Sequence, residues 1–138
     1  MLGVINRIVS ETARAPTLVE ALASIVDHIC QTLDVDACSI FISDDERREY
    51  VLLATEGLNK KLIGKAQVKF GEGLIGRVGE REEPLNVENA VSHADYFPHP
   101  KLEEQAYSAF LGVPIIDRAH LQGIIVVQQE EKRCFAEE

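Results

Sequence analysis

The stretch 66–86, AQVKFGEGLIGRVGEREEPLN, decides the fold because its apolar spacing changes from that of a strand to that of a helix at a run of glycines. Up to Phe70, apolar and polar residues alternate, which is the period of a strand with one buried face. After the glycines, apolar residues recur at helical spacing until Pro84, which excludes further helix. The stretch therefore predicts a strand over 66–70, a short helix over 73–82 and a second short strand over 85–87.

Gly71, Gly73 and Gly76 spell G-x-G-x-x-G between the strand and the helix, a pattern found where a backbone approaches the pyrophosphate of a dinucleotide. The preceding strand of such a site is buried on both faces, whereas Gln67 and Lys69 interrupt this one. The helix is also short, and the chain before it does not alternate strand and helix. We interpret the glycines as a tight turn with close packing, and keep a dinucleotide site as the less favoured alternative.

Composition is that of one soluble globular domain, because 46% of the 138 residues are hydrophobic and 27% are charged. The net charge of -9, from 14 basic and 23 acidic residues, argues against a nucleic-acid partner. No apolar run is long enough to span a membrane, and the first residues lack the apolar core of a signal peptide. We expect a single cytoplasmic domain over 1–138.

The cysteines favour the same compartment, because their odd number and unrelated spacings make neither a disulfide framework nor a zinc site. They are Cys30, Cys38 and Cys134. We expect small buried side chains at the first two, with a redox or nucleophilic cysteine as the less favoured alternative.

Two helices are expected at the start of the chain. The first ends before Pro16, and its apolar face consists of Leu2, Ile5, Ile8 and Val9. The second begins at Thr17, which forms a capping box with Glu20. Its apolar stripe needs a sheet to pack on and contains Leu18, Ala21, Leu22, Ile25, Val26, Ile29, Cys30 and Leu33.

Two hairpins follow from paired apolar runs with short connections, so the sheet is expected to be antiparallel. The pairs are CSIFISDD with YVLLATEG, and AFLGVPIID with LQGIIVVQQ. Residues 40–42 and 124–127 are apolar at successive positions, so both faces of these strands must be covered. Helices cover one face, and the short helix after Gly73 and the segment 88–108 cover the other.

The segment 88–108 is long for a connection in a compact domain and has no sustained period, which is typical of a lid. We expect Tyr96 and Phe97 to tuck into the sheet face beneath it, where a small ligand would bind. His93, Asp95 and His99 suggest a metal site as a less favoured alternative, since no fourth ligand is evident.

The order of these elements, with "EPLNV", "FLGVPI" and "LQGIIVV", resembles a GAF domain across nearly the whole chain. The runs VDACSIFISDD, FLGVPII and IIVVQQ are similar to the amino-terminal GAF domain of enzyme I of the nitrogen phosphotransferase system, a phosphoenolpyruvate-protein phosphotransferase family. The resemblance implies an α+β, profilin-like fold with a five- or six-stranded antiparallel sheet of core order 2-1-5-4-3. Helices would lie on one face, and a short helix and long loop would roof a pocket on the other.

The resemblance also implies a regulatory role. The domain would sense nitrogen status through 2-oxoglutarate or glutamine and set the autophosphorylation of downstream enzyme I domains, which would use phosphoenolpyruvate and Mg²⁺. The phosphate would pass to a small His-containing phosphocarrier protein. None of His28, His93, His99 or His120 has the Gly-Gly-x-Thr-Ser-His setting of the family's phosphorylated histidine. We therefore expect no catalytic residue, metal or cofactor in this chain.

Residues 134–138 have the residue types of the first turn of a closing helix, so we expect the domain to be truncated within that helix. Without that helix the apolar face of the first helix would be bare, which predicts a homodimer through it. For the pocket we expect Phe41, Leu53, Arg77, Asn86, Phe97 and Leu111. Arg77 would meet a dicarboxylate near the start of a helix, and a solvated arginine is the alternative.

Two other classes of function stay open. One is a dimerisation or sensor module of another signalling protein, such as a sigma-54-type activator or a histidine kinase, with a pocket filled by its own side chains. The other is an enzyme, a methionine sulfoxide reductase of GAF type, which needs several cysteines around the pocket.

Overall fold

The computed structural model describes residues 17–97, 99, 102, 107–132, 134 and 135. The expected first helix lies outside them, as does most of the expected closing helix. The described elements are α2 (Leu18–Leu33), β1 (Ala37–Asp44), β2 (Glu49–Glu56), η1 (Lys60–Leu62), β3 (Gln67–Lys69), α3 (Gly73–Arg81), β4 (Leu85–Val87), η2 (Ala90–Ser92), β5 (Ala109–Asp117) and β6 (His120–Gln129). No helix in this part of the chain is long and apolar enough to cross a membrane.

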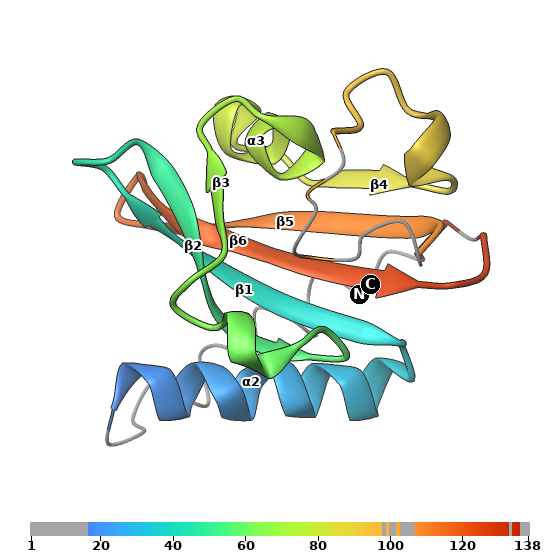
Figure 1. Ribbon diagram of the computed structural model, residues 1–138, viewed down its shortest axis with the longest axis horizontal. Coiled ribbons are helices and arrows are strands. Elements are labelled where there is room, and N and C mark those ends of the chain that lie inside the picture. Colours follow the sequence, from blue (N-terminus) through green and yellow to red (C-terminus); the bar gives the residue numbers. More distant parts are fainter. Residues whose placement is uncertain (1–16, 98, 100–101, 103–106, 133, 136–138) are drawn as a thin grey trace.

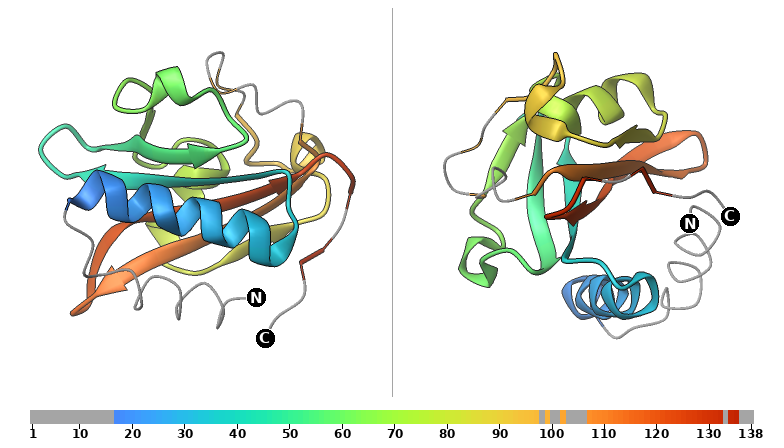
Figure 2. Two further views of the ribbon diagram at one scale, coloured as in Figure 1. Left: turned by 90° about the horizontal axis from the view of Figure 1, so that it is seen from below. Right: turned by 90° about the vertical axis from the view of Figure 1, so that its right-hand side faces the viewer.

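The fold is α+β, with a curled six-stranded sheet in the order β3-β2-β1-β6-β5-β4 and antiparallel pairing throughout. With the three-residue edge strand β3 set aside, the other five strands, renumbered along the chain, lie in the order 2-1-5-4-3. Figure 1 shows α2 beneath one face of the sheet and α3 above the other. The two further views in Figure 2 show the same three layers.

The stretch 66–86 folds as its spacing predicts, into β3, α3 and β4. Gly71 has a φ of 78°, and a Cβ on Gly76 would lie 2.5 Å from the carbonyl carbon of Gly71, so the turn packs directly on the helix. The glycines therefore serve a tight turn. The dinucleotide alternative is wrong because it needs a parallel sheet, and every strand pair here is antiparallel.

The start of α2 is fixed by Thr17, whose Oγ1 accepts a hydrogen bond from the backbone N–H of Glu20 at 3.1 Å. This contact satisfies one of the free N–H groups of the first turn. The helix ends at Asp34, which adopts the left-handed conformation with a φ of 51° and donates its N–H to the carbonyl of Cys30.

The sheet separates two hydrophobic cores, so both of its faces are covered as expected. The core on the α2 side contains Leu22, Ile25, Val26, Ile29, Cys38, Ile40, Ala54, Ala109, Leu111, Val113, Ile125, Val127 and Phe135. The core on the α3 side contains Phe41, Tyr50, Leu52, Ala66, Val68, Leu74, Ile75, Val78, Val87, Ala90, Leu102, Phe110, Ile124 and Val126. Neighbouring residues of β6 thus belong to opposite cores.

One irregularity interrupts the pairing of β1 with β2. Ile40 lies opposite Ala54 and Phe41 lies opposite Leu52, so Leu53 is an extra residue in β2 with no partner in β1. Such a bulge changes which face the following side chains meet. As a result Ala54 joins the α2-side core, although Leu52 belongs to the α3-side core.

Candidate functional site

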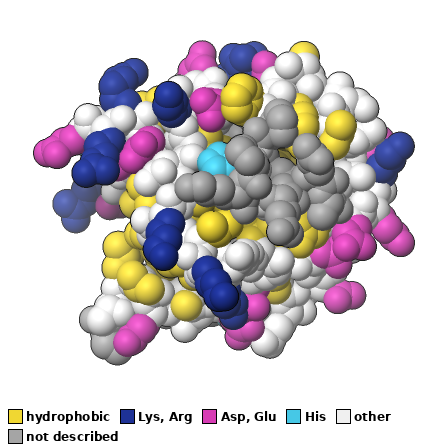
Figure 3. Space-filling model, viewed as in Figure 1, with side chains coloured by type: hydrophobic (Ala, Val, Ile, Leu, Met, Phe, Trp, Pro, Cys, Tyr) yellow, Lys and Arg dark blue, Asp and Glu magenta, His cyan; other side chains and the backbone are white. Residues whose placement is uncertain are grey.

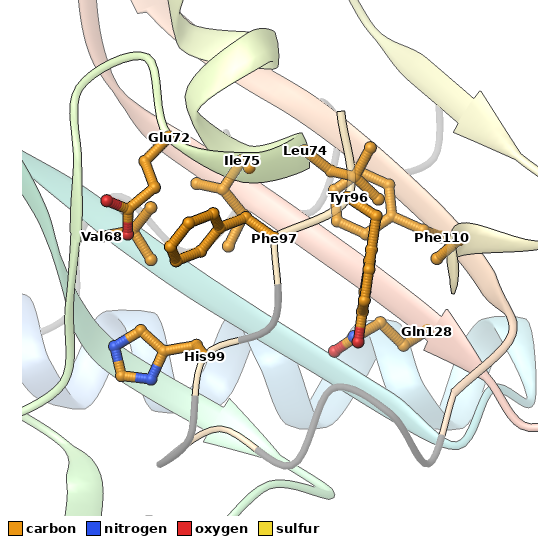
Figure 4. Close-up of a pocket in the computed structure, with 11 residues that line it drawn as sticks. Val68, Glu72, Leu74, Ile75, Tyr96, Phe97, His99, Phe110 and Gln128 are labelled. Carbon is orange, nitrogen blue, oxygen red and sulfur yellow. The ribbon is translucent and has the colours of Figure 1, made fainter. Parts of the chain in front are cut away.

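A narrow pocket lies between the amino end of α3, β3, the sheet and residues 88–97 and 99, which we call the lid. It is lined by Val68, Glu72, Gly73, Leu74, Ile75, Ala90, Tyr96, Phe97, His99, Phe110 and Gln128, and its enclosed volume is about 20 Å³. Figure 4 shows side chains from α3, the lid and the sheet converging on it. A volume of this size holds about one water molecule. We call this space the lid pocket.

The base of the lid pocket is polar at Gln128, on β6. This side chain is only 5% exposed and lines the pocket. In Figure 4 the ring of Tyr96 runs from the lid toward Gln128. A buried amide needs hydrogen-bond partners, and a water or a ligand group in the pocket can supply them.

The rim of the lid pocket is acidic at Glu72, the residue that precedes α3. The first backbone N–H groups of α3, at Gly73 and Leu74, receive no side-chain cap from Glu72. His99 is held at the same rim by a 2.9 Å hydrogen bond from its Nε2 to the carbonyl oxygen of Gln67. No lysine or arginine lines the pocket within the described part of the chain.

A charged pair fastens the lid to α3. Arg77 donates to Asp95 through two hydrogen bonds, Nε to Oδ2 at 3.0 Å and Nη2 to Oδ1 at 2.9 Å. The hydrogen bonds from Arg77 lower the pKa of the Asp95 carboxyl, and those to Asp95 raise the pKa of the Arg77 guanidinium. The backbone N–H of Asp95 also donates to Nδ1 of His93 at 3.0 Å, which orders the lid at this point.

Of the six expected pocket residues, the structure brings only Phe97 to the lid pocket. Phe97 is 54% exposed, so it covers the pocket without being buried, whereas Tyr96 packs against the α3-side core. Phe41 lies on the α3 side but is buried in the core. Leu53 and Leu111 pack on the α2 side, so grouping them with Phe41 was wrong.

Arg77 and Asn86 also lie away from the lid pocket. The Arg77 fork is occupied by Asp95, so it is not open to a ligand here, although the side chain remains partly exposed to water. Asn86, on β4, donates from Nδ2 to the carbonyl oxygen of Phe135 at 2.7 Å and accepts from the N–H of Phe135 at 3.1 Å. These two bonds tie the segment after β6 to β4.

Sequence reasoning missed Gln128 and Glu72. The signal for Gln128 was present, because Ile124 and Val126 share its face of β6 and belong to the α3-side core. No pattern in the sequence predicts that Glu72 lies at the pocket, since its position at the rim depends on the path of the glycine turn.

Cys30 and Cys38 lie on the side of the sheet away from the lid pocket. Cys38 belongs to the α2-side core, and Cys30 packs against it. Burial, followed by the nearby charge of Glu56, raises the pKa of Cys30 to about 11, and burial raises the pKa of Cys38 well above its ordinary value. Within the described residues, no three His, Cys, Asp or Glu side chains are grouped as a metal site would require.

Residues 17–138 match the model of the GAF domain family, and the chain belongs to that family. It is 42% identical over 137 residues to two proteins called "Phosphoenolpyruvate-dependent phosphotransferase system", from Escherichia coli (strain K12) and Salmonella typhimurium (strain LT2). The match covers 99% of this chain and 18% of each relative, so the chain spans less than a fifth of their length.

Solved structures of the same kind of domain are similar throughout. The GAF domain of a phosphoenolpyruvate-protein phosphotransferase from Coxiella burnetii is 51% identical with a TM-score of 0.88, covering 99% of this chain and 81% of that one. The corresponding Acinetobacter domain is 35% identical with a TM-score of 0.83, covering 99% and 80%. A free methionine-R-sulfoxide reductase from Neisseria meningitidis, at 17% identity, a TM-score of 0.77 and coverage of 93% and 72%, shares the fold alone.

Proposed function

We propose that this chain is the regulatory, small-molecule-sensing GAF domain of a cytoplasmic phosphoenolpyruvate-protein phosphotransferase. It would control autophosphorylation of downstream enzyme I domains in response to nitrogen status. Those domains would use phosphoenolpyruvate and Mg²⁺ and pass the phosphate to a His-containing phosphocarrier protein. The observation that carries the proposal is the 51% and 35% identity to GAF domains of such phosphotransferases, over 99% of the chain.

Glutamine fits the chemistry of the lid pocket better than 2-oxoglutarate does. The carboxamide of glutamine offers both a donor and an acceptor to the amide of Gln128, and its ammonium group suits the carboxylate of Glu72. The ligand carboxylate suits the uncapped N–H groups at the start of α3. A second carboxylate, as in 2-oxoglutarate, would be buried near Glu72 with no cation among the described lining residues.

Binding requires the lid to move, because about 20 Å³ is far too small for an amino acid. The lid is held by Arg77 and Asp95, two side chains that remain 28% and 27% exposed and so exchange readily with water. Ligand affinity would therefore include the free energy needed to open this pair.

A movement of the lid could be transmitted through β4 to the segment after β6. The lid begins immediately after β4, and Asn86 of β4 holds the backbone of Phe135 through two hydrogen bonds. We infer that displacement of the lid shifts this attachment and so reaches the domains that follow.

Thermal denaturation with 10 mM glutamine or 10 mM 2-oxoglutarate tests the ligand. Selective binding to the native state must raise the melting temperature, so we expect a rise with glutamine and little with 2-oxoglutarate. Gln128→Leu removes the amide at similar volume and should abolish the response. Gln122→Leu, at an exposed position of the same strand, is the matched control. Equal responses of both variants would contradict the role of Gln128.

The regulatory role is tested in the complete phosphotransferase. Transfer of phosphate from phosphoenolpyruvate should depend on glutamine in the intact protein. Removal of this domain should abolish that dependence while leaving autophosphorylation. Dependence that survives the deletion would place the sensor elsewhere.

A second candidate is supported by the small cavity itself, about 20 Å³. A dimerisation domain of another signalling protein, with its pocket filled by its own side chains, needs no ligand. It predicts that neither compound changes the melting temperature. Sedimentation analysis would then report the homodimer expected through the first helix, and a monomer at all micromolar concentrations would contradict that expectation.

A further inference from the structure

The part of the lid that covers the pocket lies along one face of α3. Phe97 packs over Gly73, where an added Cβ would lie 3.4 Å from the Cβ of Phe97 and 3.7 Å from its carbonyl oxygen. Asp95 pairs with Arg77, which lies on the same face of the helix as Gly73, one turn further on. Figure 3 shows acidic and basic side chains side by side at the surface over α3, near the top of the view. Lifting Phe97 from Gly73 therefore also draws Asp95 away from Arg77.

Opening of the lid takes from Arg77 the carboxylate that holds it. Its other ion-pair partner in the described part of the chain is Glu80, which is 3.7 Å away and 56% exposed, so this second pair is weak. Side chains of a helix point toward its amino end. The freed guanidinium can therefore reach the first turn of α3, where Gly73 and Leu74 line the lid pocket.

A glutamine bound in the lid pocket brings a carboxylate that needs a cation. No lysine or arginine is among the described residues that line the closed pocket. The N–H groups at the start of α3 carry only partial positive charge, and a buried carboxylate without a cation is costly. Opening the lid therefore leaves a guanidinium of the protein and a carboxylate of the ligand, each without a partner, about one helical turn apart.

We propose that a ligand carboxylate replaces Asp95 at the guanidinium of Arg77 when the lid opens. This inference rests on the proposed function and adds how the site is regulated. Asp95 is a competitor built into the lid, and it occupies the fork of Arg77 when no ligand is bound. Arg77 is then a specificity-determining residue that selects ligands with a carboxylate. The exchange moves the lid without leaving the guanidinium unpaired in either state.

Two variants separate this exchange from a simple latch, because each breaks the pair from one side. Asp95→Asn and Arg77→Gln should both release the lid. Release is seen as faster amide hydrogen exchange at Tyr96, whose N–H bonds to the carbonyl of His93 at 3.1 Å within the lid. Glutamine affinity, measured by titration calorimetry, should rise about fivefold in Asp95→Asn and fall about tenfold in Arg77→Gln. A latch that never contacts the ligand would raise the affinity in both. Glu83→Gln, an exposed site outside the lid, is the matched control and should leave both measurements unchanged.

Glutaminamide, in which a carboxamide replaces the carboxylate, tests the same contact from the side of the ligand. The parent chain should bind it about tenfold more weakly than glutamine, and this difference should shrink in Arg77→Gln because the guanidinium that reads the carboxylate is gone. Tighter glutamine binding by Arg77→Gln, or full discrimination retained in that variant, would overturn the exchange and leave glutamine as the ligand. Absence of glutamine binding in both the parent and Asp95→Asn would overturn the exchange together with the ligand proposed above.

Discussion

Arg77 and Asp95, one on α3 and one in the lid, form a two-bonded pair at 3.0 Å and 2.9 Å across a gap of 18 residues in the chain. The guanidinium fork therefore already holds a carboxylate of the protein. Because each side chain is about a quarter exposed, the pair fastens the lid without fixing it permanently.

This pair makes stability depend on acid pH. Since the folded-state pKa of Asp95 is lowered, the unfolded chain binds more protons, and the stabilisation is complete only above the unfolded value of about 3.9. It is lost as the pH falls through the folded-state pKa. Urea unfolding between pH 2 and pH 6 should show Asp95→Asn less stable than the parent at pH 6, with the difference shrinking toward pH 2. Asp117→Asn, at an exposed site, should show no such convergence.

Ile124 and Ile125 test the two-sided burial of the sheet. They are 0% and 1% exposed and belong to opposite cores, so replacing either with alanine should lower the free energy of unfolding by about 2–5 kcal/mol. Ile116→Ala, at a site 45% exposed, should change it by only about 0.5 kcal/mol. Chemical denaturation measures all three. A small effect at either Ile124 or Ile125 would mean that one face of the sheet is open.

Thr17 should stabilise α2 through its cap. Thr17→Ala removes the acceptor for the Glu20 N–H and should lower the free energy of unfolding by about 1 kcal/mol in urea denaturation. Thr32→Ala, at an exposed position inside the same helix, serves as the control, and it should be neutral or slightly stabilising because alanine has the higher helix propensity. A Thr17 variant no worse than its control would contradict the capping role.

The three cysteines should differ in reactivity toward a disulfide reagent at pH 8. Cys134 is exposed and should react at once. Cys30, with a pKa of about 11, carries little thiolate and should react slowly. Cys38 is fully buried and should react only on unfolding. Timed labelling followed by peptide mass spectrometry separates the three, and prompt labelling of Cys38 in the native protein would contradict its placement.

The elements were predictable because each is set by local spacing. The alternation before Phe70, the stop at Pro84 and the cap at Thr17 act within a few residues, and β3, α3, β4 and α2 follow from them. Burial of both sheet faces was predictable for a related reason, since consecutive apolar residues in a strand must face both ways.

The grouping of side chains at the site was harder to predict. Phe110 and Leu111 are both apolar, so no polar neighbour marks which of them faces the lid, and the bulge at Leu53 changes the faces in β2. The pairing of Arg77 with Asp95 depends on the path of a lid that has no period. Such contacts are set by tertiary packing and leave no local pattern.

The alternation along β6 also locks the strand in place. A slip of one residue past β1 and β5 would carry the amide of Gln128 into the apolar layer against α2 and push Val127 toward the lid. The same displacement would disrupt the packing of both hydrophobic cores. A misaligned β6 is therefore destabilised in both cores at once, so the register of this strand keeps Gln128 on the side of the lid pocket.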